Sequence, residues 1–165
     1  MGLYSLNLGH LANETGNYKQ ARKYILESFP FIKNEPQYIL LAQIGLAEND
    51  LLLGNTRQAR EKALQIYNSA PNLNFNETGT ALTLIIIKSY LQENNFERAI
   101  KSAGELLTTD PNAETKKAVF ELLAEAYAGK GAYAEALKAK DSVIAATTAL
   151  DNIRNQALLT NSQVK

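Results

Sequence analysis

Apolar residues recur along most of the chain at steps of three and four, the spacing that puts side chains on one face of a helix. The steps are broken by short polar turns and then resume. The run before the turn at Gly54 consists of Leu40, Ile44, Ala47 and Leu51, and the run after it of Ala59, Ala63, Ile66 and Tyr67. We find no alternating segment of strand length with hairpin chemistry. The pattern therefore predicts an all-α protein.

The turns share a six-residue figure that occurs four times. It reads GNYKQA at 16–21, GNTRQA at 54–59, NNFERA at 94–99 and GAYAEA at 131–136. The alanines that close the figure, Ala21, Ala59, Ala99 and Ala136, are separated by 38, 40 and 37 residues. A recurring period of this size indicates stacked supersecondary units. We predict eight helices in four antiparallel pairs.

Glycine opens three of the four figures, at Gly16, Gly54 and Gly131, and Asn94 stands at the fourth. Glycine enters the left-handed backbone region without steric cost, and asparagine is its usual substitute at a helix end. We expect all four residues in that region. Between pairs the chain reads NEPQ at 34–37, APNLN at 70–74 and TDPN at 109–112. In the last of these, Asp110 is expected to cap the following helix.

These boundaries predict a repeat domain at 1–147, with units of about 2–35, 36–75, 76–111 and 112–147. The remaining residues, 148–165, form a further helix without Gly or Pro. A short heptad-like seam follows that helix through Leu150, Ile153, Ala157, Thr160 and Val164. Two readings stay open: a helix that caps the end of the stack, or the beginning of a stalk.

The repeated residues resemble the tetratricopeptide repeat family. In the family's unit a small residue lies midway along the first helix, an aromatic opens the second, and an alanine follows three residues later. The fourth unit matches at Ala124, Tyr127, Gly131, Tyr133 and Ala136, and the first at Gly9, Gly16, Tyr18 and Ala21. Thr56 and Ile87 depart from the pattern, and the spacing exceeds the family's period of about 34 residues. The resemblance implies a right-handed α-solenoid in which the repeated tyrosines, including Tyr133, lie in the core.

The resemblance also implies a binding surface, because the first helices of such repeats line a concave groove. Carried over position by position, the groove consists of Leu6, His10, Asn13, Ile44, Glu48, Leu52, Leu84, Lys88, Gln92, Glu121 and Glu125. Chaperone-binding members hold a terminal carboxylate with a basic clamp. Leu6, His10, Gly45, Ala81 and Ile85 stand near the clamp positions here. We therefore expect no binding of chaperone tails.

Composition argues against several other functions. Seventeen Lys and Arg balance seventeen Asp and Glu, whereas a nucleic-acid binder usually carries a basic excess. The chain has no cysteine, which excludes thiolate metal sites and cysteine nucleophiles within it. The longest apolar run, Leu84–Ile87, is too short to span a bilayer. We expect no nucleic-acid partner and no membrane insertion.

Candidate catalytic chemistry is sparse. His10 is the single histidine, and no second ligand type accompanies it in a metal-binding spacing. Glu121 and Glu125 lie four apart on one helical face, which suits acid–base chemistry but also a solvated or groove-lining strip. No phosphate-binding loop, nucleophile elbow or zincin string occurs. We predict no enzyme activity, cofactor or metal.

The sequence thus favours a protein-interaction scaffold that binds a peptide or helical segment of another protein. A second hypothesis is the extracytoplasmic input segment of a membrane-anchored signalling protein, because the stretch from Lys140 is similar to the end of repeat regions in Bacteroidota-type sensors. A third is a small-molecule enzyme that uses Glu121 and Glu125. Cytoplasm and periplasm both stay open, as do a larger parent protein and a homodimer through the C-terminal helix or the repeat ends.

Overall fold

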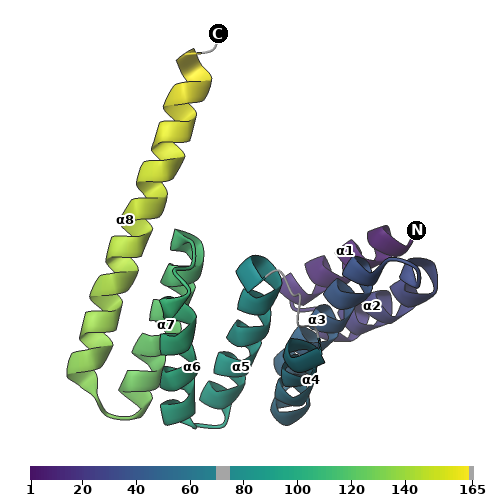
Figure 1. Ribbon diagram of the computed structural model, residues 1–165, viewed down its shortest axis with the longest axis horizontal. Coiled ribbons are helices and arrows are strands. Elements are labelled where there is room, and N and C mark those ends of the chain that lie inside the picture. The colour runs from purple at the N-terminus through teal and green to yellow at the C-terminus, as the bar shows by residue number, and fades with distance from the viewer. Residues whose placement is uncertain (70–74, 164–165) are drawn as a thin grey trace. The chain divides into compact units, whose positions relative to one another are not determined.

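The computed structural model describes residues 1–69 and 75–163, and all regular structure in these ranges is helical (Figure 1). The expected separator at 70–74, Val164 and the side chain of Thr160 lie outside the described part. The chain forms two compact units, Met1–Glu93 and Asn94–Lys165. The boundary between these units falls within the third expected pair, whose first helix lies in unit 1 and whose second lies in unit 2.

Unit 1 consists of five α-helices and one π-helical turn. They are α1 (Gly2–Glu14), α2 (Tyr18–Ile32), α3 (Pro36–Leu52), α4 (Thr56–Ser69), η1 (Phe75–Gly79) and α5 (Thr80–Gln92). Within this unit, consecutive α-helices from α1 to α5 pack on one another. In addition α1 contacts α3, and α3 contacts α5. The first helices of successive pairs are therefore neighbours within this unit.

The turns adopt the backbone expected from the repeated figure. Gly16, Gly54 and Gly131 have φ of 81°, 80° and 79°, and Asn94 has φ of 56°. The expectation for Asp110 is wrong. Its φ is 51°, so it turns the chain before the helix, and Asn112 takes the capping position, where its side chain accepts a hydrogen bond from the Thr115 amide at 2.8 Å.

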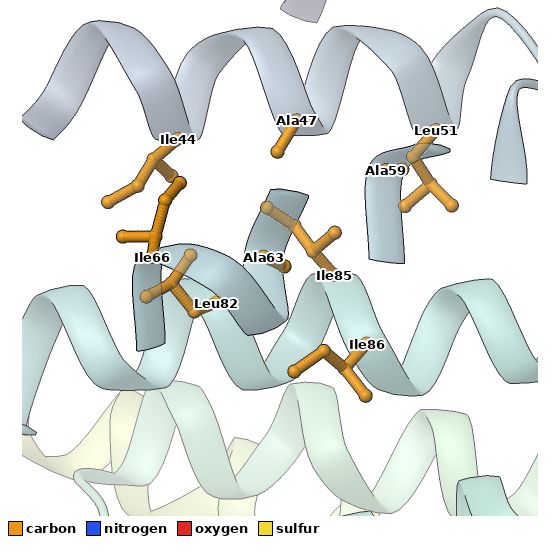
Figure 2. Packing of buried hydrophobic residues seen from close by; sticks show 9 residues of the cluster. All are labelled: Ile44, Ala47, Leu51, Ala59, Ala63, Ile66, Leu82, Ile85 and Ile86. Carbon is orange, nitrogen blue, oxygen red and sulfur yellow. The ribbon is translucent and has the colours of Figure 1, made fainter. Parts of the chain in front are cut away.

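Small residues hold the helices of unit 1 close together. Figure 2 shows alanines of α3 and α4 among isoleucines and leucines, in a cluster of Ile44, Ala47, Leu51, Ala59, Ala63, Ile66, Leu82, Ile85 and Ile86. Between α1 and α2 the approach is closer still, since a Cβ at Gly9 would lie 2.5 Å from Ile25 Cγ1. The four repeated alanines are all buried: Ala21, Ala59, Ala99 and Ala136.

A buried carboxylate ties three helices of unit 1 together. Asp50 of α3 is 0% exposed, and its Oδ1 accepts a hydrogen bond from Arg22 Nη1 of α2 at 2.7 Å. Its Oδ2 pairs with Lys62 Nζ of α4. One anion thus serves two cations whose side chains reach the surface, each about 38% exposed.

Unit 2 consists of α6 (Phe96–Thr108), α7 (Ala113–Gly129) and α8 (Tyr133–Gln163), in which α7 packs on both α6 and α8. Residues 148–163 continue the helix before them without a break, because α8 runs through 31 residues. Its last turns continue past the ends of α6 and α7 (Figure 1). Leu150 is half-buried, whereas every side chain from 151 to 159 is exposed. We call residues 151–163 the α8 overhang.

Candidate functional site

The expected binding residues of unit 1 lie on three neighbouring helices. His10 of α1 lies over Gly45 of α3, because a Cβ at Gly45 would stand 3.0 Å from His10 Cε1. Gln92 of α5 donates a hydrogen bond to the Leu51 carbonyl of α3 at 3.5 Å. It also accepts one from the Thr56 hydroxyl of α4 at 2.8 Å. These contacts join the first helices into one surface.

Three of the expected surface residues lie in the interior instead. Leu6 is 1% exposed and Ile44 is 7% exposed, so both are core residues. Asn13 is 5% exposed, and its Oδ1 accepts a hydrogen bond from Asn49 Nδ2 of α3 at 2.8 Å. A buried amide must satisfy its polar atoms within the protein, which explains this pairing. We therefore assign these three residues to packing between helices.

The other expected residues of unit 1 reach the surface to different degrees. His10, Glu48 and Leu84 are half-buried, and Leu52, Lys88 and Gln92 are exposed. Residues four apart share a stripe on each helix, so Glu48 and Leu52 present one charge and one apolar side chain together. We call His10, Glu48, Leu52, Leu84, Lys88 and Gln92 the first-helix surface. It offers both signs of charge beside apolar area.

Glu121 and Glu125, the two expected residues of unit 2, lie together in a groove between α7 and α8. The groove has a volume of about 560 Å³, and its lining consists of Glu121, Ala124, Glu125, Ala128, Lys140, Val143 and Ile144. Both glutamates are exposed, and Lys117 Nζ lies 3.9 Å from Glu121 Oε1. Four of the lining residues are alanines or branched aliphatics, namely Ala124, Ala128, Val143 and Ile144. We call this depression the α7–α8 groove.

The α8 wall of this groove was missed from the sequence. Counted from the repeated alanines, Ile144 stands at the position of Phe29 in α2 and Leu107 in α6, which are half-buried. Ile144 is 64% exposed. The sequence signal was a large apolar residue, Ile144, at a repeat position in the last expected pair. The sequence does not show whether another helix covers that position. Tyr133 shows the same effect: it was expected in the core and is 70% exposed.

Within the described ranges, no group of three or more potential metal ligands comes together. Over the same residues, none of the helices combines the length and the apolar character that crossing a membrane requires. Glu121 and Glu125 stand on the rim of an open groove with aliphatic neighbours rather than beside a nucleophile.

Comparisons with known proteins identify no relative. No model of a known protein family matches the chain, and neither a curated protein nor a solved structure does.

Proposed function

We propose that this chain is a non-catalytic protein-interaction scaffold of the tetratricopeptide type. It binds a peptide or helical segment of another protein on the first-helix surface. The observation that carries this proposal is the contact of α1 with α3 and of α3 with α5. Three helices presenting side chains on one continuous surface can contact several turns of a bound segment at once.

The chemistry of the surface indicates what kind of segment it binds. Leu52 and Leu84 supply apolar area, while Glu48 and Lys88 supply opposite charges from α3 and α5. A segment with an apolar stripe and charges of both signs fits this pattern. Charged groups at a partly exposed interface act mainly on register and on the rate of association.

Two charge reversals test the proposal. The variant Glu48→Lys/Lys88→Glu keeps the net charge but inverts both charges of the surface, so capture of the partner should fall about tenfold or more. The measurement is quantitative crosslinking and mass spectrometry with the parent organism's extract, followed by titration with the protein identified. Circular dichroism should show unchanged helicity.

The matched control lies on α2. Lys23 Nζ and Glu27 Oε1 are 3.9 Å apart, and their side chains are 64% and 52% exposed. The variant Lys23→Glu/Glu27→Lys also makes two reversals without a change of net charge, and capture should stay as in the parent chain. If both variants lose capture equally, or if neither loses it, the assignment of the surface is contradicted.

A second candidate function is an input segment of a signalling protein. The α8 overhang favours it, because a helix that projects from a domain is suited to passing a change of association onward. In that case the bound partner would act by changing the pairing of α8. A full-length protein with a membrane span and an output domain after α8 would support this candidate.

A further inference from the structure

In three of the four helix pairs, the residue that begins the second helix contacts the C-terminal part of the next pair's first helix. The Tyr18 carbonyl accepts a hydrogen bond from Asn49 Nδ2 of α3 at 2.7 Å. The Thr56 hydroxyl of α4 donates to Gln92 Oε1 at 2.8 Å. A Cβ at Gly129 of α7 would lie 2.4 Å from Cζ of the Phe96 ring. The same contact therefore occurs three times, with different chemistry each time.

Tyr133 opens α8 at the fourth such position, and no described helix follows α8. Its side chain is 70% exposed. Further along, Phe29 of α2 and Tyr38 of α3 pack against the same buried cluster, whereas Ile144 at the corresponding place in α8 is 64% exposed. The α7–α8 groove is thus the place where the repeat order puts another helix, antiparallel to α8.

The α8 overhang is a helix that lacks cover. Ile153 and Leu158 are 59% and 62% exposed, and both lie in the stretch from 151 to 159, where every side chain is exposed. At 1.5 Å per residue the overhang is about 20 Å long, which matches four turns of a packed helix. Large apolar side chains that stand exposed along a helix favour burial against a partner surface.

We propose that the α8 overhang of a second copy of this chain occupies the α7–α8 groove, and that the contact is reciprocal. The proposal depends on the proposed function in one respect only, that this protein takes up a helical segment. A two-fold axis perpendicular to two neighbouring α8 helices makes them antiparallel, the direction that the repeat order requires. By symmetry, each copy places its overhang in the groove of the other. Both grooves are then occupied, and the assembly stops at two copies.

Charge complementarity selects a second copy as the occupant. The rim of the groove carries Glu121 and Glu125, and the overhang carries the exposed Arg154. The opposite wall carries Lys140, and the overhang carries Asp151. Both charge pairs have opposite signs in an antiparallel arrangement. The residues of this contact all belong to unit 2, whereas the first-helix surface consists of residues of unit 1.

Two charge-reversal variants of the 165-residue chain test this proposal by sedimentation velocity over a concentration series. The groove variant is Glu121→Arg/Glu125→Arg, and the overhang variant is Arg154→Glu. Each should weaken its own dimer about tenfold or more, because both reciprocal contacts then bring like charges together. An equimolar mixture should restore dimers, since a mixed pair has one original contact and one with the charges exchanged.

Further variants separate this inference from other outcomes. Leu158→Asp should also weaken the dimer, and Leu26→Asp on α2, at an exposed leucine of similar accessibility, should not. A parent chain that stays monomeric at every concentration overturns the inference, as does a mixture that gains no dimer. The Glu48→Lys/Lys88→Glu chain should dimerise normally but capture less partner. Undiminished partner capture in that chain with intact dimers therefore contradicts the proposed function and not the dimer.

Discussion

The two compact units differ in what they bury. All buried polar residues in the described part of the chain lie in unit 1, namely Asn13, Ser28, Asn49, Asp50 and Ser89. The buried residues of unit 2 are small or aliphatic, such as Ala99, Ala126 and Ala139. Asn49 donates to Asn13 of α1 and Asp50 accepts from Arg22 of α2, so these buried groups select particular helix faces, because a different packing would lose both hydrogen bonds. Helix faces made of alanine form no side-chain hydrogen bonds and so do not select a particular neighbour. In our proposal, the α7–α8 groove of unit 2 accepts a further helix.

The largest expected effect comes from stripping Asp50 of its cations. In Arg22→Met/Lys62→Met the carboxylate stays buried without a partner, which should lower the free energy of unfolding by about 3–5 kcal/mol. Urea denaturation followed by circular dichroism measures the change. Adding Asp50→Leu removes the orphaned charge and should recover most of the loss.

The counterpart in unit 2 is the pair of Lys130 Nζ and Glu97 Oε1 at 3.1 Å, in which both side chains are exposed. Lys130→Met should cost about 0–1 kcal/mol, because solvent screens such a pair. A similar cost for the two substitutions would remove the distinction between a polar interior in unit 1 and an apolar one in unit 2.

Two glycine-to-alanine substitutions, one in each unit, should change the free energy of unfolding in opposite directions. A Cβ at Gly9 would meet the buried Ile25, so Gly9→Ala should destabilise unit 1 by about 1–3 kcal/mol. A Cβ at Gly104 in α6 meets nothing within 4 Å. Gly104→Ala should therefore stabilise by about 0.5–1 kcal/mol. Thermal unfolding of both variants provides the comparison, and a gain at Gly9 would disprove the close approach of α1 and α2.

The smallest expected effect concerns pH. The hydrogen bond from Lys116 Nζ to Asp110 Oδ1, 2.6 Å long, holds the pKa of the Asp110 carboxyl below its usual value. A lowered pKa stabilises the folded state above the ordinary carboxylate pKa, and this contribution is lost as the pH falls through the lowered value. Asp110→Asn should slightly flatten the acid side of the stability profile at low salt. Both charges lie at the surface, so high salt should abolish the difference.

The regular features of the fold were predictable because each has a local cause. A left-handed turn favours glycine or asparagine, as at Gly16 and Asn94, and a close approach of two helices favours a small residue, as at Ala21. Both kinds of residue can be read directly from the sequence. Asp50 was not predicted, because its burial depends on cations supplied by α2 and α4, 28 and 12 residues away.

The candidate site was predictable only in part. Glu121 and Glu125 follow from the spacing on one helix, but Leu6 and Ile44 lie inside because a neighbouring helix covers them. Periodicity identifies the stripe that a helix presents and leaves open which neighbour covers it. The same limit hid the exposure of Tyr133, which is 70% exposed at the start of α8.

Hydrogen exchange of the α8 overhang tests most directly whether unit 2 accepts a helix. The chain contains no cysteine, so disulfide exchange cannot link the copies. Amide protection of residues 151–163 should rise with protein concentration and fall again in the Glu121→Arg/Glu125→Arg chain. An overhang that exchanges at the rate of a free peptide at every concentration would contradict the account.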